Sequence, residues 1–181
     1  MYTDVHDQIK ETALQMFKAN DKHFRTDCGS YLFSPRHSDG KMKFSDKMDE
    51  KQAVLYNAAR KASAVLETGT YMGHSLAIML HANPNLRVTT IDLTENYCRG
   101  SLDVLRKKFP NAQIEFIQGN SLDVIPTLKS TYDMFHFDGS HKPDVVRQEF
   151  ISSLNLFDKT KSEIRFVIDD LFYTELARDI S

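Results

Sequence analysis

The sequence predicts an α/β fold in a single domain, with a mostly parallel sheet that carries helices on both faces. Short apolar runs alternate with segments of helical periodicity from about residue 64 to residue 169. Such regular alternation is typical of parallel strands joined by right-handed helical crossovers. The chain has 181 residues, of which 41% are hydrophobic and 27% charged, as expected for one globular domain.

The first 45 residues are expected to form a helix followed by a loop. Apolar side chains at roughly helical spacing predict a helix over residues 3–18. Residues 20–44 contain glycine, proline and several aromatic residues, which indicate either a lid over a substrate or a plain surface loop. A second helix over residues 46–62, capped by Ser45 or Asp46, begins a core that runs to residue 181.

The core is expected to alternate strictly between strand and helix. The strands are expected over residues 64–67, 87–92, 113–117, 134–138 and 165–169. The helices between them are expected over residues 75–81, 96–109, 122–128 and 143–157. Ligands of open parallel sheets lie outside the carboxyl ends of the strands, near the point where strand order reverses. The last residues of each strand are therefore the candidate site residues.

The first strand ends in a turn with the pattern Glu67-x-Gly69-x-Tyr71-x-Gly73. Gly69 supplies the positive φ of a tight turn, and Gly73 lets the next helix begin close to the strand or to a ligand. Tyr71 stands where a dinucleotide site needs glycine against a pyrophosphate. The turn therefore favours a nucleoside without phosphates, S-adenosylmethionine, over a nicotinamide dinucleotide, with an ordinary strand-to-helix turn as the alternative. Glu67 is placed to accept hydrogen bonds from ribose hydroxyls or a ligand amine.

The next two strand ends supply further polar groups. Asp92 follows Gly73 by 19 residues, where an acidic side chain reaches the ribose of a bound nucleoside or else caps the turn. The third strand leaves through Asn120 and Ser121. This turn either meets an adenine edge, through its backbone or the Ser121 hydroxyl, or leaves that serine to cap the following helix.

Three carboxylates are expected to meet where the fourth and fifth strands end. Asp138, Asp169 and Asp170 would repel one another unless they bind a cation or have raised pKa values. An all-oxygen set favours Mg²⁺, or Mn²⁺ or Ca²⁺, over zinc, with plain capping roles as the alternative. His141 or Lys142 would then take a proton from a substrate hydroxyl, and histidine is the more natural base near neutral pH.

The segment from Glu67 to Ser75 resembles the Glu-x-Gly-x-Tyr-x-Gly-Tyr-Ser pattern of class I S-adenosylmethionine-dependent methyltransferases. More narrowly, it is similar to the cation-dependent O-methyltransferases of small molecules, typified by catechol and caffeoyl-coenzyme A O-methyltransferases. The resemblance covers about residues 46–170, and His74 departs from the usual tyrosine. It implies a three-layer Rossmann-like methyltransferase fold, here without the usual last two strands.

The resemblance also implies roles for individual residues. Glu67 and Gly69 would contact the methionine end of the cofactor, Asp92 its ribose and Ser121 the surroundings of its adenine. Asp138, Asp169 and Asp170 would bind the cation, and His141 stands where the family has a catalytic lysine. The complete set of expected cofactor-binding residues is Glu67, Gly69, Tyr71, Gly73, Ser75, Asp92, Asn120, Ser121 and Asp138.

The expected function is O-methylation of a small hydroxylated compound, assisted by a divalent cation. A nucleoside-binding protein without turnover and a metal-dependent hydroxylase on the same fold are the alternatives. The net charge of −2 and the lack of a long basic run argue against nucleic acid as a partner. Cys28 and Cys98 lie outside any CxxC pattern, and no apolar stretch is long enough to span a membrane. We therefore expect a cytoplasmic protein in which either a homo-oligomer contact or the N-terminal segment covers the exposed sheet edge.

Overall fold

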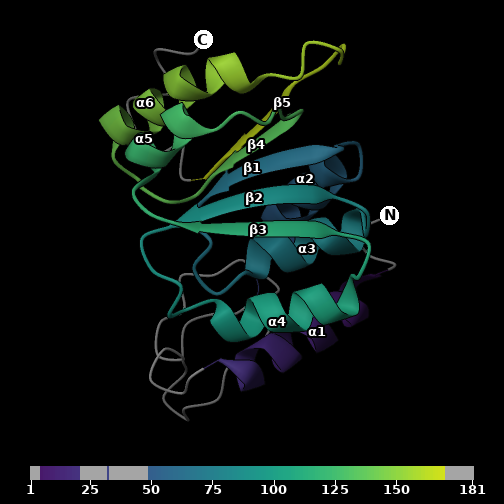
Figure 1. The fold of residues 1–181 in the computed structure, drawn as a ribbon. Coiled ribbons are helices and arrows are strands. Elements are labelled where there is room, and N and C mark those ends of the chain that lie inside the picture. Colours follow the sequence, from purple (N-terminus) through teal and green to yellow (C-terminus); the bar gives the residue numbers. More distant parts are fainter. Residues whose placement is uncertain (1–4, 21–31, 33–48, 170–181) are drawn as a thin grey trace.

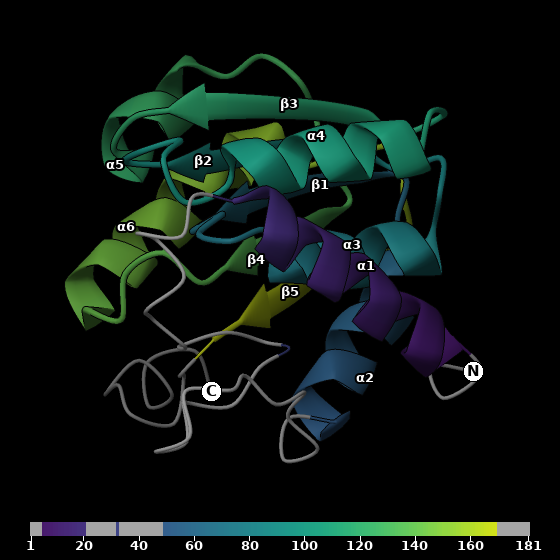
Figure 2. The same cartoon turned by 90° about the horizontal axis from the view of Figure 1, so that it is seen from below.

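A computed structural model describes residues 5–20, 32 and 49–169 of the chain. Apart from Asn20 and Leu32, the whole of the expected lid region lies outside these ranges, as do the predicted caps Ser45 and Asp46 and the predicted ligand Asp170. In the described ranges the structure has three layers, in which a central sheet is covered by helices on both faces (Figures 1 and 2). The predicted α/β fold is confirmed.

Within the described ranges the sheet has five strands in the order β3-β2-β1-β4-β5, and all four neighbouring pairs are parallel. Their bounds are β1 (Ala64–Thr68), β2 (Arg87–Asp92), β3 (Gln113–Gln118), β4 (Met134–Phe137) and β5 (Arg165–Ile168). The chain runs outward from β1 to β3 and then returns to the other side of β1 as β4. The strand order therefore reverses between β1 and β4, which is where parallel sheets of this kind place their ligands.

Among the described residues, the helices α1 to α4 cover one face of the sheet, and α5 and α6 cover the other (Figure 1). The first group is α1 (His6–Ala19), α2 (Asp49–Ala59), α3 (His74–Ala82) and α4 (Arg99–Lys108). The second group is α5 (Ser121–Val124), extended by the 3-10 turn η4 (Ile125–Thr127), and α6 (Pro143–Ser153), extended by η5 (Leu154–Leu156). The single helices expected over 122–128 and 143–157 thus each end in a tighter turn.

The two cores follow from the alternation of side chains along the strands. Val65, Val88 and Met134 point toward α1 to α4, whereas Leu66 and Phe135 point toward α5 and α6. β1 is buried at all five positions, as expected for the central strand of a sheet covered on both faces. The second core is rich in aromatic rings, and Phe135 stacks on Phe166 with ring centroids 5.0 Å apart.

Helix α1 is part of the first core. Ile9, Ala13 and Met16 are fully buried, and Asn20 at its end donates a hydrogen bond of 2.8 Å to the Ser101 hydroxyl of α4. The Ser101 amide donates back to the Asn20 side chain over 3.1 Å. The N-terminal helix is thereby fixed to α4. Within the described ranges, no helix combines the length and apolar character needed to cross a membrane.

Candidate functional site

The turn after β1 requires glycine at position 69. Gly69 has φ +86°, and its amide donates a hydrogen bond of 2.9 Å to the Ile91 carbonyl of β2. A Cβ atom at this position would lie 2.3 Å from the Asp138 carbonyl oxygen, so a side chain would collide with the backbone that leaves β4. Gly73, with φ +76°, is the N-cap of α3, and its Cβ would meet only side chains, at 3.3 Å or more. Gly69 thus has the predicted positive φ and also lets the β1 and β4 exits approach each other. Gly73 instead lies against side chains of α1 and α4, and its approach to a ligand stays a prediction.

Glu67 lies beneath this turn with no exposed surface. The strand register places it between Thr90 of β2 and His136 of β4, on the same face of the sheet. Its Oε2 accepts 2.6 Å from the Thr90 hydroxyl, and its Oε1 accepts 2.6 Å from the Ser75 hydroxyl and lies 3.0 Å from His136 Nδ1. Both oxygens are therefore used within the protein, and the contact of Glu67 with a ligand stays a prediction.

The Glu67 network reaches the turn itself. The Thr90 hydroxyl also contacts the Thr70 hydroxyl at 2.6 Å, and the Gly73 amide donates 2.8 Å to the Thr70 carbonyl. A chain of hydrogen bonds thus runs from the buried carboxylate to the start of α3. Neither Thr90 nor His136 is among the predicted site residues, although both follow from the register once β1 is placed between β2 and β4.

Asp92 at the end of β2 faces the same turn and keeps part of its surface exposed. Its Oδ2 accepts 2.8 Å from the Tyr71 amide, and its Oδ1 accepts 3.3 Å from the Thr94 amide. A carboxylate has about four acceptor positions, so these two bonds leave room for the hydroxyls of a ribose. Asp92 is both a turn cap and a candidate ligand. The rings of Tyr71 and Tyr97 contact each other, with centroids 5.4 Å apart.

The β3 exit is organised by Asn120. Its side-chain oxygen accepts 3.2 Å from the Leu122 amide and so caps α5, the role that the sequence had left open for Ser121. Ser121 is the first residue of α5 and faces the carboxyl group of Glu149 on α6. The contact of either residue with an adenine stays a prediction.

Glu149 is a buried carboxyl that sequence reasoning missed. It has no exposed surface, and neither of its oxygens has a hydrogen-bond partner within the described part of the chain. Burial raises its pKa, while the nearby hydroxyls of Ser121 and Thr68 lower it to a smaller extent. The Thr68 hydroxyl is likewise buried without a partner in that part. The one sequence signal for Glu149 as a buried residue is its helical spacing, which places it on the face of α6 that lies toward the sheet.

Two of the three predicted cation ligands meet at the exits of β4 and β5. Phe137 pairs with Ile168, so Asp138 and Asp169 are the next pair beyond the strands. The pKa of Asp138 is raised to about 9, first by burial and then by a hydrogen bond with Asp169 and by the negative charge of Asp169. The positive charge of Lys51 lowers this pKa to a smaller extent. Lys51, on α2, forms an ion pair with Asp169 and was missed from the sequence.

Within the described residues, no group of three or more His, Cys, Asp or Glu side chains is arranged to hold a metal ion. Asp170, the third predicted ligand, lies outside them. The structure therefore brings together Asp138 and Asp169, and it adds a lysine to the pair.

The predicted bases lie on the loop that follows β4. His141 and Lys142 are exposed, three and four residues after Asp138, and Lys142 is the N-cap residue of α6. His74, in contrast, is buried at the start of α3, and burial lowers its pKa to about 3. His74 is therefore neutral at physiological pH, so the departure from the family pattern adds no charge beside the turn.

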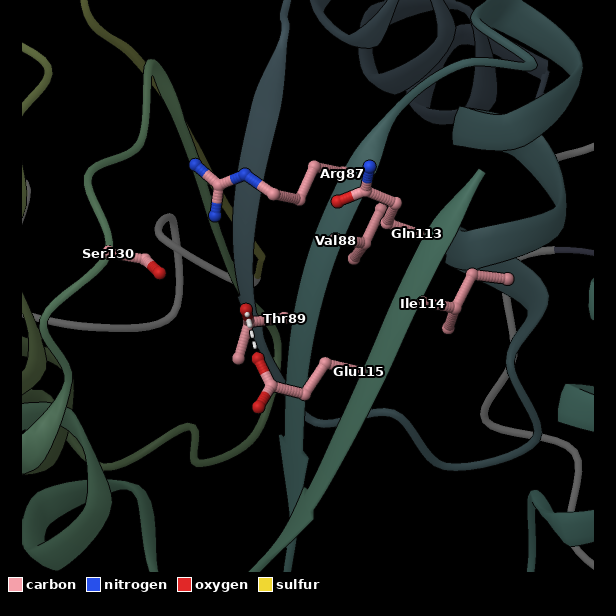
Figure 3. Close-up of a pocket in the computed structure, with 7 residues that line it drawn as sticks. All are labelled: Arg87, Val88, Thr89, Gln113, Ile114, Glu115 and Ser130. Atoms are coloured by element: carbon pink, nitrogen blue, oxygen red, sulfur yellow. Dashed lines mark hydrogen bonds between the residues drawn. The ribbon is translucent and has the colours of Figure 1, made fainter. Parts of the chain in front are cut away.

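A surface groove lies at the opposite end of the sheet (Figure 3). It is lined by the first residues of β2 and β3 and by Ser130, and the Thr89 hydroxyl donates 3.1 Å to Glu115 across it. Arg87 covers the Tyr132 ring at 5.1 Å from the ring centroid. The groove contains none of the predicted site residues, which gather at the carboxyl ends of the strands.

Comparisons with known proteins bear on this arrangement. The family model described as "Methyltransferase domain" matches residues 66–170, more than half of the chain. The O-methyltransferase hkm8 of Aspergillus hancockii is 22% identical over 122 residues, which are 66% of this chain and 47% of that protein.

Solved structures agree in fold. The SAH-bound methyltransferase PaMTH1 of Podospora anserina has a TM-score of 0.55 at 17% identity, covering 81% of this chain and 56% of that one. The O-methyltransferase TomG of Streptomyces achromogenes, in complex with SAM, has a TM-score of 0.50 at 25% identity, covering 62% of this chain and 52% of that one. The chain thus spans about half the length of these relatives.

Proposed function

Because the chain belongs to the methyltransferase domain family, we propose that it transfers a methyl group from S-adenosylmethionine to an oxygen of a small hydroxylated compound. The observation that carries this proposal is the meeting of the glycine turn with Asp92 at the switch point of the sheet. There the Tyr71 amide lies 2.8 Å from Asp92 Oδ2. This contact supports a nucleoside site because it holds a partly exposed carboxylate beside a turn that has no room for side chains at Gly69.

Different residues at this edge would bind different parts of S-adenosylmethionine. Asp92 would accept hydrogen bonds from the ribose hydroxyls, and the Asn120–Ser121 turn would lie beside the adenine. The buried Glu67 network would keep the turn rigid, so that the binding surface is formed before the ligand arrives. When bound, S-adenosylmethionine supplies a methyl group that is activated by the positive charge on its sulfur.

The chain's own residues would then position the acceptor and remove its proton. The acceptor hydroxyl would be held beside the methyl group that the cofactor supplies, and its proton would pass to His141 or Lys142 as the oxygen bonds to the methyl carbon and the carbon–sulfur bond breaks. Both side chains are exposed on the loop that follows β4. The acceptor is proposed to be a catechol, a vicinal diol or a sugar.

Assistance by a divalent cation stays a prediction. The described residues supply two carboxylates, and one of these is already paired with Lys51. This donor set fits a cation only in part, so no step of the proposed mechanism passes through a metal.

Calorimetry with S-adenosylmethionine and S-adenosylhomocysteine tests the binding step. We expect both to bind the wild-type chain and to bind Asp92→Asn more weakly, by about 1–3 kcal/mol for lost hydrogen bonds to a charged acceptor. If neither compound binds, the methyltransferase proposal is wrong.

Transfer of a labelled methyl group to a panel of catechols, diols and sugars tests turnover. We expect at least one acceptor to be methylated, and a loss of about 10²–10⁴-fold in rate when both His141 and Lys142 are replaced by alanine. Binding of the cofactor without transfer to any panel member would instead favour a nucleoside-binding protein without turnover.

A further inference from the structure

Helix α2 places a lysine at the acidic edge of the sheet. The Lys51 ammonium forms an ion pair with Asp169 Oδ2. The Asp169 side chain is 11% exposed and the Lys51 side chain 31%, so the pair lies at the boundary between the core and the solvent. Ion pairs that are partly withdrawn from water are less screened than surface pairs, so this contact contributes substantially to the local field.

The lysine and a divalent cation would compete for the Asp169 carboxylate. A cation that bridges the β4 and β5 exits takes at least one oxygen from each of Asp138 and Asp169, and Asp169 Oδ2 is held by Lys51. A divalent ion within a few ångströms of an ammonium is also repelled by it. The lysine therefore weakens the binding of such an ion at this edge.

We propose that the Lys51 ammonium is the resident positive charge of this edge, and that it keeps the affinity of Asp138 and Asp169 for divalent cations low. Whether a metal ion occupies this edge of the sheet thus depends on Lys51. The proposal does not depend on the proposed methyl transfer, because it concerns only the occupancy of two carboxyl groups in the chain without cofactor or acceptor.

Titration of the full chain with Mn²⁺, followed by electron paramagnetic resonance of the free ion, tests the proposal. We expect weak binding to the wild type and binding at least about tenfold tighter to Lys51→Met, because the competing charge is gone. Lys51→Arg should stay weak, and the double variant Lys51→Met with Asp169→Asn should lose the gain. Lys61→Met, which removes an exposed lysine just beyond α2, is the matched control and should behave as the wild type.

A second readout guards against a variant that folds poorly. Added Mg²⁺ should raise the melting temperature of Lys51→Met and leave that of the wild type nearly unchanged, since a ligand stabilises the state that binds it. Tight binding of Mn²⁺ to the wild type would overturn the proposal. Weak binding to the wild type that does not tighten in Lys51→Met would overturn it as well.

Discussion

Glu67 is the centre of a buried hydrogen-bond network, and the strand register brings its partners together. Its neighbours Thr90 and His136 lie at the same level of β2 and β4, and Ser75 reaches it from the first turn of α3. A fully buried carboxylate is stable only when hydrogen bonds replace its hydration. The three partners meet this condition and also connect the turn to the centre of the sheet.

Also at the scale of single residues, position 69 requires glycine more strictly than position 73 does. Gly69→Ala would bring its new Cβ into the Asp138 carbonyl, whereas Gly73→Ala meets only side chains and mainly suffers the cost of positive φ, roughly 1–2 kcal/mol. We expect Gly69→Ala to lose more free energy of unfolding and most of its affinity for S-adenosylhomocysteine. Urea unfolding and calorimetry measure both quantities. Equal effects of the two substitutions would contradict this explanation of the turn.

At the scale of elements, α1 and α4 are joined by a pair of buried hydrogen bonds between Asn20 and Ser101. Asn20→Ala removes both bonds and leaves the buried Ser101 amide without this partner, so we expect a loss of about 2–4 kcal/mol in the free energy of unfolding. Gln15→Ala, at an exposed position of the same helix, is the control and should change it by less than about 0.5 kcal/mol. Urea unfolding of the two variants makes the comparison, and a loss in Asn20→Ala no larger than in the control would rule out this link.

Helix α6 carries a carboxyl group whose titration is coupled to folding. Burial raises the pKa of Glu149, so the folded chain keeps a proton that the unfolded chain releases above the ordinary value of 4.5. The stability that Glu149 contributes is therefore complete below that value and is lost as the pH rises toward the raised pKa.

Glu149→Gln should remove this pH dependence, because its amide stays neutral. We expect the variant to gain stability relative to the wild type between about pH 4 and pH 8, by on the order of 1–3 kcal/mol at the upper end. Urea unfolding at a series of pH values measures the difference, with Glu50→Gln, an exposed position of α2, as the control. A difference that does not change with pH would show that folding does not raise the pKa of Glu149.

At the scale of the whole molecule, most of the fold could be predicted from the sequence. The apolar runs of β1 to β5 are short and are separated by clear helical patterns, and each strand was placed within one residue of its observed ends. The likeness of the Glu67-to-Ser75 segment to S-adenosylmethionine-dependent methyltransferases is confirmed by the family match. These features depend on local periodicity and turn chemistry, which a single sequence records.

The missed residues depend on tertiary packing. Lys51 and Glu149 are ordinary members of amphipathic helices in the sequence, and only the packing of α2 and α6 against the sheet brings them to Asp169 and to Ser121. Long-range contacts such as these leave no periodic signal in the sequence.

The homo-oligomer remains a prediction, because β5 is the last strand within the described ranges and Asp170 and the residues after it lie outside them.

We propose that the carboxyl edge of the sheet forms one nucleoside pocket around the switch point. A crystal structure of the chain with S-adenosylhomocysteine is the most direct test of this pocket. We expect the ribose against Asp92 and the nucleoside between the Gly69 turn and the Asn120–Ser121 turn. A ligand bound at the opposite end of the sheet, in the groove of Figure 3, would contradict it.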